Sequence, residues 1–390
     1  MARQLKSKVS DKVGLMSSNN KIPFIQPVLP TSEEMIADYE QIQVNNFFSN
    51  NGPFYYEFIE AIENYFDAKV HSSAVANATL GLILALKSSA IKDRKYVLTP
   101  SFTFAATALS IIWAGYEPYF VDIEQDTFQL DIHQTRKLLE TERNNIAGIM
   151  LCNPFGIGLK NISEFEQISS EFNVPLIIDS AAGFGSDYDN KNKVGTKGLS
   201  EIFSLHITKP FGISEGGIVC SHDKEFIDTV ENLKNFGFNS MRSVDSVGFN
   251  AKITEINCAI GLRMLPHLDA RINARQKIYN QYVEAFSKHD VTFIDNAERS
   301  SLCFASLILP KGWSKYDLMS RFGQDDIEVR DYYNPVLHDA VAFKQYPHLD
   351  MTNTNYYAQN MISLPNSETL NEVEVNRIIK VIDNYALDAS

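Results

Sequence analysis

Short apolar runs alternate with helix-like stretches over the middle of the chain, from about residue 70 to residue 220. The apolar runs predict strands at residues 95–99, 118–121, 148–152, 175–179, 201–205 and 217–220. Between them, apolar residues recur at helical spacing in segments 79–88, 105–113 and 162–172. Strands that alternate with helices pair in parallel, so the pattern predicts an α/β fold whose mostly parallel sheet is covered by helices on both faces.

The flanking patterns divide the chain into three parts. Residues 1–22 form a polar N-terminal extension without the apolar segment of a signal peptide. Residues 23–265 form the large α/β domain, which begins with helices signalled by Thr31 and by the turn before Pro53. Residues 266–390 form a long connecting helix and a smaller C-terminal α+β domain.

The composition narrows the classes of function. The 390 residues carry a net charge of −13, which argues against a nucleic-acid partner or a membrane surface but still allows a small anionic ligand. No run of about 18 or more apolar residues occurs, so no membrane span is expected. Four well-separated cysteines predict free thiols, no bound metal and a reducing, cytoplasmic location; they are Cys152, Cys220, Cys258 and Cys303.

Two residues at strand ends carry the main candidate chemistry. Lys209 follows the strand predicted at 201–205 and precedes a glycine-rich turn, where a lysine can form a Schiff base if its pKa is lowered. Asp179 closes a buried strand, and pairing with the pyridine nitrogen of pyridoxal phosphate (PLP) would offset the cost of its burial. Taken alone, a lysine is more often a solvated surface residue, and Asp179 could equally cap the next helix.

Two weaker signals accompany them. Asn77-Ala78-Thr79 opens a predicted helix after a small-residue turn, and its free N–H groups could bind phosphate, although an ordinary helix cap has the same sequence. Phe104 follows a predicted strand and could stack on a pyridine ring or lie in the core. The pair Gly156 and Gly158 lacks the third glycine of a dinucleotide-binding motif and is set aside.

In combination these residues resemble the DegT/DnrJ/EryC1/StrS family of sugar aminotransferases, which are fold-type I PLP enzymes. The stretch Ser204-Leu-His-Ile-Thr-Lys209, followed by Glu215-Gly-Gly, is similar to the family's lysine motif. Further matches occur between about Pro23 and Ile382, at Asn51-Gly52-Pro53, Pro100-Ser-Phe-Thr-Phe, Gly248-Phe-Asn250 and Ile362-Ser-Leu-Pro365. The resemblance implies a large PLP-binding domain and a small C-terminal domain.

The resemblance also implies roles for single residues. Lys209 would hold PLP as a Schiff base, Asp179 would pair with its pyridine nitrogen, and Phe104 would stack on its ring. His206 belongs to the lysine motif and counts as catalytic with Lys209 and Asp179. The phosphate would bind at Ala78, Thr79 and Ser204 and, from the neighbouring subunit, at Asn250. The implied assembly is a homodimer with shared active sites.

Three positions depart from the family pattern. Ala78 stands where the family has glycine, and Lys252 stands where it has arginine. Ala182 stands where the family often has a glutamine or histidine that touches the phenolic oxygen of PLP. Another group, or water, must therefore contact that oxygen in this chain.

The resemblance implies transamination of a nucleotide-linked keto sugar with L-glutamate as the amino donor. Relatives that replace the lysine with histidine are dehydratases, and Lys209 argues against that branch. The segments 235–238 and 248–255 are most similar to enzymes that convert dTDP-4-keto-6-deoxyglucose to the 4-amino-4,6-dideoxy sugar, a reaction of lipopolysaccharide O-antigen biosynthesis. Candidate substrate-binding residues are Arg242, Lys252, Arg330 and His338.

Other assignments stay open at this point. The substrate could be a 3-keto sugar that gives a 3-amino product, or a UDP- or GDP-linked sugar. The chain could also be a PLP-binding regulatory relative without catalysis or, on the residues alone, a dehydrogenase that binds NAD(P). Only a transaminase would lose the visible band of the lysine-bound cofactor when glutamate is added.

Overall fold

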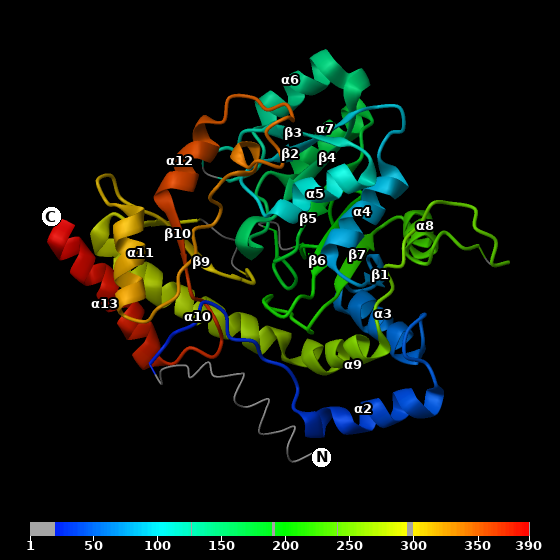
Figure 1. The fold of residues 1–390 in the computed structure, drawn as a ribbon, viewed down its shortest axis with the longest axis horizontal. Coiled ribbons are helices and arrows are strands. Elements are labelled where there is room, and N and C mark those ends of the chain that lie inside the picture. Colours follow the sequence, from blue (N-terminus) through cyan, green and yellow to red (C-terminus); the bar gives the residue numbers. More distant parts are fainter. Residues whose placement is uncertain (1–19, 126, 189–191, 240, 295–298, 390) are drawn as a thin grey trace.

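A computed structural model describes residues 20–125, 127–188, 192–239, 241–294 and 299–389 (Figure 1). Its main sheet has seven strands in the order β1-β7-β6-β5-β4-β2-β3. The strands are β1 His71–Val75, β2 Tyr96–Pro100, β3 Glu117–Val121, β4 Ile146–Cys152, β5 Leu176–Asp179, β6 Ser200–Ser204 and β7 Gly217–Ser221. Strands β2 to β6 pair in parallel, and β7 runs antiparallel to β6 and β1. The predicted α/β class and mostly parallel sheet are confirmed.

Strand β1 departs from the prediction, which places only a small-residue turn before the helix at residue 78. The residues Ser72, Ser73 and Ala74 are buried in the sheet, where β1 pairs antiparallel with β7. Their side chains are small and show neither an apolar run nor an alternation of polar and apolar residues. The strand therefore owes its existence to pairing with a segment far along the chain.

Helices cover both faces of this sheet (Figure 1). The helices are α2 Ser32–Asn45, α3 Pro53–Tyr65, α4 Ala78–Ser89, α5 Ala105–Ala114, α6 Ile132–Glu142, α7 Ile162–Phe172, α8 Lys224–Lys234, α9 Glu255–Met264, α10 Leu268–Phe286, α11 Lys315–Gln324, α12 Thr352–Asn360 and α13 Glu372–Ala389. Both predicted start signals are confirmed, because Thr31 caps α2 in a capping box with Glu34 and Pro53 is the first residue of α3.

The C-terminal part has its own small antiparallel sheet in the order β10-β9-β8. Its strands are β8 Thr292–Phe293, β9 Ala305–Ile308 and β10 Met361–Leu364. Helix α10 leads from the large sheet to this part and packs there against α13 (Figure 1). Ile22, the last residue of the predicted extension, is buried and pairs with Ile327, whereas residues 1–19 lie outside the described residues. Within the described ranges, no helix has the length and apolar character needed to span a bilayer.

The sheet topology brings the carboxyl ends of its central strands together. Strand β5 ends at Asp179, which lies beside Ile202 of β6 on one side and beside Cys152 of β4 on the other. Because side chains alternate across a strand, Asp179, Cys152 and Ser204 share one face of the sheet. The candidate residues at 179 and 204 therefore meet at one edge.

Candidate functional site

Asp179 is a buried carboxylate at the end of β5, with 4% of its surface exposed. Its Oδ2 accepts a hydrogen bond from Thr107 Oγ1 on α5 (2.6 Å), and its Oδ1 accepts one from the backbone N–H of Ala181 (3.1 Å). Burial raises the pKa of Asp179, and these two hydrogen bonds and the charge of Lys209 act against that rise. Its carboxylate makes no ion pair within the described ranges, so a cationic ligand group would reduce the cost of burying its charge.

A pair of threonines holds this carboxylate from the side of α5. Thr103 Oγ1 lies 2.9 Å from Thr107 Oγ1 and 3.1 Å from Cys152 Sγ. The sequence reasoning missed this network, although its signal is visible: two threonines stand four residues apart, at the start of the helix that follows β2. The network orients Asp179 before any ligand binds.

Lys209 lies in the loop after β6, where its N–H donates to the carbonyl oxygen of His206 (2.8 Å). Its charge affects Asp179, Cys152 and Cys303, so the Lys209 ammonium group lies near all three. Burial raises the pKa of both thiols, which therefore stay protonated. The two strand-end residues of the sequence analysis, Lys209 and Asp179, thus lie close together at one sheet edge.

The predicted phosphate-binding residues converge between α4 and β6. Asn77 caps α4 with its side chain, and the N–H groups of Ala78 and Thr79 have no partner inside the helix. Ser204 lies opposite Gly217 of β7, and a Cβ on Gly217 would come within 2.7 Å of the backbone nitrogen of Ala78. The helix start and Ser204 are therefore near enough to hold one anion together.

Two further predicted residues flank this edge of the sheet. Phe104 does not lie in the core: it immediately precedes α5, and 61% of its surface is exposed, which leaves its ring face free to stack. The ring of His206 contacts Thr208 Oγ1 through Nδ1 (2.8 Å) and approaches Glu215 Oε1 through Nε2 (3.6 Å). Both roles stay predictions.

The loop between α8 and α9 carries three of the predicted residues, Arg242, Asn250 and Lys252. Lys252 Nζ donates to Asn250 Oδ1 (2.8 Å) and Asn235 Oδ1 (3.1 Å), and burial lowers the pKa of Lys252. The side chains of Asn250 and Arg242 are exposed. Exposure is what the predicted contact of Asn250 with a neighbouring subunit requires, and that contact stays a prediction.

The two predicted residues of the C-terminal loop make internal contacts. The Arg330 guanidinium lies over the ring of Phe24 (5.1 Å) and 3.6 Å from Glu328 Oε2. His338 is buried, with Nδ1 2.7 Å from Ser101 Oγ, and burial lowers its pKa. His338 thus joins its loop to the end of β2, and Arg330 remains half-exposed at the other end of that loop.

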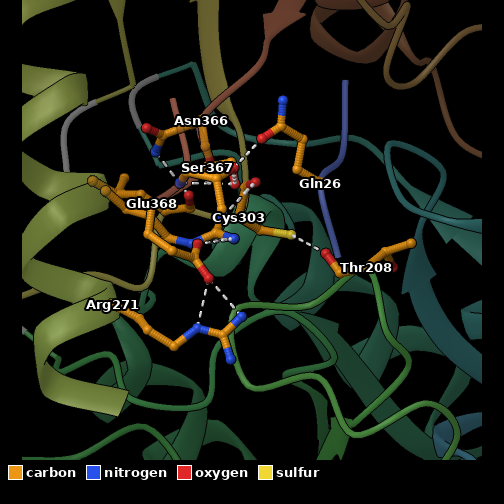
Figure 2. A network of polar contacts seen from close by, with 10 residues as sticks. Gln26, Thr208, Arg271, Cys303, Asn366, Ser367 and Glu368 are labelled. Atoms are coloured by element: carbon orange, nitrogen blue, oxygen red, sulfur yellow. Dashed lines mark hydrogen bonds and ion pairs between the residues drawn. The ribbon is translucent and has the colours of Figure 1, made fainter. Parts of the chain in front are cut away.

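Cys303 reaches the lysine loop from the C-terminal part, a contact that nothing in the sequence indicates. Cys303 Sγ donates to the carbonyl oxygen of Thr208 (3.8 Å). Figure 2 shows Cys303 between Thr208 and a buried ion cluster. In that cluster Glu368 bridges Arg271 at 2.6 Å and Arg275 at 2.7 Å. The cluster is connected through Arg275 and Cys303 to the carbonyl oxygen of Thr208, directly before Lys209.

Tyr333 is a second residue near Asp179 that the sequence does not single out. Its ring stacks on Phe155 at 5.3 Å and meets Phe102 edge-on at 5.4 Å. Burial raises the pKa of Tyr333 well above its usual range, and the neighbouring Cys152 and Asp179 raise it further. The sequence marks Arg330 and His338 of the same loop as candidates, but nothing in it indicates the direction of the Tyr333 side chain.

Known proteins resemble the chain over nearly its whole length. The model of the DegT/DnrJ/EryC1/StrS aminotransferase family matches residues 30–383. Protein Rv3402c of Mycobacterium tuberculosis is 38% identical over 369 residues, which cover 93% of this chain and 89% of that protein. The dTDP-4-amino-4,6-dideoxy-D-glucose transaminase of Shigella dysenteriae is 27% identical over 363 residues, 92% of this chain and 97% of that enzyme. The crystal structure of a DegT DnrJ EryC1 StrS aminotransferase from Brucella abortus matches with a TM-score of 0.84 at 25% identity, over 91% of this chain and 95% of that one.

Proposed function

The chain belongs to the DegT/DnrJ/EryC1/StrS aminotransferase family, and from that premise we propose that it is a PLP-dependent aminotransferase of a nucleotide-linked keto-deoxy sugar. The observation that carries the proposal is the buried Asp179 carboxylate, which lies beside Lys209 and makes no ion pair within the described ranges. A protonated pyridine nitrogen is a fitting partner for this carboxylate, and a lysine amine is a fitting anchor for an aldehyde. The residues present therefore fit PLP.

Each residue of the site has a separate task in this proposal. PLP, when bound, supplies an electron-withdrawing ring that stabilises negative charge on the neighbouring carbon. Asp179, oriented by Thr107, keeps the ring nitrogen protonated. Lys209 Nζ would hold the cofactor, and its amine would serve as the base and acid that moves a proton at the donor's α-carbon. Phe104 covers the ring, and Ser204 with the start of α4 holds the phosphate.

The proposed acceptor is dTDP-4-keto-6-deoxyglucose, and the proposed donor is L-glutamate. The likeness to the Shigella dysenteriae transaminase supports this acceptor. Arg242, Lys252 and Arg330 are the candidate cations for the diphosphate or the donor carboxylate. Arg330 is favoured, because the rings of Phe24 and Tyr332 form a row that connects it to Tyr333 beside Asp179.

The proposed assembly is a homodimer in which Asn250 reaches the phosphate in the neighbouring subunit. The loop between α8 and α9 supports this arrangement, because its described residues expose four large apolar side chains: Phe236, Met241, Val244 and Val247. Contact with a second subunit would bury these side chains.

Borohydride reduction of the PLP-loaded protein, followed by peptide mapping, tests the anchor. The reduced cofactor should appear on Lys209, and Lys209→Ala should lose both the label and turnover. Lys224→Ala is the matched control, because it removes an exposed lysine that pairs with Asp228 on the surface. A label on a different lysine, or no label, would refute the proposal.

Incubation with L-glutamate and a panel of dTDP-, UDP- and GDP-linked keto sugars tests the substrate, with products identified by mass and NMR. A 4-amino product from the dTDP-linked sugar is expected. Amination at another carbon, or on another nucleotide, would replace the substrate assignment and leave the reaction class standing. If the cofactor's visible band persisted in glutamate, the chain would be a PLP binder without transaminase activity.

A further inference from the structure

The phosphate arm and the phenolic oxygen of PLP lie on opposite edges of the pyridine ring, with the aldehyde carbon between them. The phosphate edge of the proposed site faces β6, β7 and α4, where Ser204, Gly217 and Ala78 meet. The strand order places β4 and β2 on the other side of Asp179. The phenolic oxygen of a cofactor held in this way points toward the ends of β4 and β2.

Tyr333 covers the ends of these two strands. Its ring stacks on Phe155, which follows β4, with a centroid distance of 5.3 Å and an interplanar angle of 13°. It also meets Phe102, which follows β2, at 5.4 Å and 87°. Contacts on two sides hold the ring in one orientation, beside the paired residues Cys152 and Asp179.

The Tyr333 hydroxyl lies among polar groups and keeps its proton. Burial raises the pKa of Tyr333 well above its usual range, and Cys152, Asp179 and Cys303 raise it further because they lie near the hydroxyl. This hydroxyl makes no hydrogen bond to any other residue of the described part of the chain. A protonated phenol is thus available to an acceptor that enters the site.

Neighbouring groups are weaker donors for the same oxygen. The Ala182 side chain has no polar atom, and its carbonyl oxygen accepts a hydrogen bond from Ser301 Oγ (2.6 Å). Cys152 Sγ lies 3.1 Å from Thr103 Oγ1, and Cys303 Sγ is directed at a backbone carbonyl oxygen 3.8 Å away. A thiol is in any case a weak hydrogen-bond donor.

We propose that the Tyr333 hydroxyl donates a hydrogen bond to the phenolic oxygen of PLP, in place of the side chain that Ala182 lacks; the inference rests on the proposed function. A donor at this oxygen draws negative charge away from it, and the oxygen then holds the proton of the neighbouring imine nitrogen less strongly. Tyr333 thereby lowers the pH at which the lysine-bound cofactor loses that proton.

A spectroscopic pH titration of the PLP-loaded protein tests this role without measuring turnover. Tyr333→Phe removes the hydroxyl and keeps the ring that stacks on Phe155. The midpoint of the visible-band titration should rise by about one pH unit, the shift expected from one hydrogen bond of ordinary strength. Tyr332→Phe, the same change one residue away, should leave the midpoint unchanged. No shift in Tyr333→Phe, or equal shifts in both variants, would overturn the inference.

A binding measurement gives a second, independent test. Cofactor-free wild type and Tyr333→Phe are each titrated with PLP and with 3-deoxypyridoxal 5′-phosphate, which lacks the phenolic oxygen. The preference of wild type for PLP should exceed that of the variant by about tenfold, and equal preferences would refute the hydrogen bond. If wild type formed no lysine-bound cofactor, the proposed function would fail together with this inference. Normal loading with unchanged Tyr333→Phe results would refute this inference alone.

Discussion

Two buried carboxylates lie on adjacent strands and differ in the number of hydrogen bonds that they accept. Asp179 on β5 and Glu201 on β6 are 4% and 0% exposed, and neither forms an ion pair within the described ranges. Their side chains point to opposite faces of the sheet. Glu201 accepts hydrogen bonds from Ser180 Oγ (2.7 Å), Tyr188 Oη (2.9 Å) and the N–H of Lys197 (2.8 Å). These donors satisfy the Glu201 carboxylate without a ligand.

Asp179 has fewer donors and a reactive neighbour. It accepts hydrogen bonds from Thr107 and from the N–H of Ala181, and it lies near the Lys209 ammonium group. Burial raises the pKa of both carboxylates, that of Glu201 to about 7, so a shifted pKa does not distinguish them. Spare acceptor capacity beside a lysine is what favours Asp179 over Glu201 as the proposed cofactor partner.

Replacing Asp179 should have the largest effect on activity. Asn has nearly the same shape as Asp but cannot carry the charge that keeps the ring nitrogen protonated. Turnover of Asp179→Asn should fall on the order of a thousandfold with little change in melting temperature. Steady-state kinetics with glutamate and the keto sugar measure this, with Glu201→Gln as the matched control on the other face. Similar losses of turnover in both variants would remove the functional distinction between the two carboxylates.

Glu201→Gln should change stability instead, and in a pH-dependent way. The pKa of Glu201 is about 7 in the fold, against 4.5 for an ordinary glutamate. Because the folded-state value is the higher one, wild type loses stability as the pH rises from about 4.5 to about 7, by about 3 kcal/mol at most. Glu201→Gln has no carboxyl group at this position, so its stability does not decrease with pH for this reason. Urea unfolding at pH 5 and pH 8 should show the stability of wild type, relative to the variant, decreasing at the higher pH; a constant difference would contradict the assignment.

Thr107→Val tests the hydrogen bond that orients Asp179. Valine keeps the branched shape but removes the donor at 2.6 Å, so turnover should fall about tenfold. Thr141→Val is the control, because the hydroxyl of Thr141 donates to the Lys137 carbonyl oxygen on an exposed helix face. Equal activity of the two variants would show that the position of Asp179 does not depend on Thr107.

Ser180→Ala should have the smallest effect. It should lower stability only, because Ser180 bonds to Glu201 on the face of the sheet opposite Asp179. It removes one of the hydrogen-bond donors to Glu201, at a cost of about 1 kcal/mol in the free energy of unfolding. Turnover should stay at the wild-type level, because the Ser180 side chain faces away from Lys209. If turnover fell more in Ser180→Ala than in Thr107→Val, the Glu201 face of the sheet would matter more for activity than the Asp179 face.

The strands of the site are predictable from the sequence because buried parallel strands are continuous apolar runs. Asp179 stands out as the polar residue that ends such a run, and the pairing of β5 with β6 brings it near Lys209. Strand β1 is different, since its buried residues are small and its pairing partner lies far along the chain. Local pattern therefore identifies the centre of the sheet better than its edge.

The contributions of the C-terminal part could not be predicted in the same way. Tyr333 and Cys303 reach the Lys209 region through ring stacking and backbone contacts that sequence spacing does not encode. The role predicted for Asn250 depends on a second subunit, and the domain boundary at residues 265 and 266 stays a prediction. Such contacts depend on three-dimensional packing rather than on any local period.

Ser101 fastens the C-terminal loop to the end of β2. Its hydroxyl accepts the N–H of His338 (2.9 Å) and lies 2.7 Å from His338 Nδ1, and its carbonyl oxygen accepts the N–H of Leu337 (3.2 Å). These hydrogen bonds lie four or five residues from Tyr333 along the chain. A hinge-like movement of the C-terminal part away from the sheet would have to break them first. Separating the two parts of the molecule during a reaction cycle would therefore cost the free energy of these contacts.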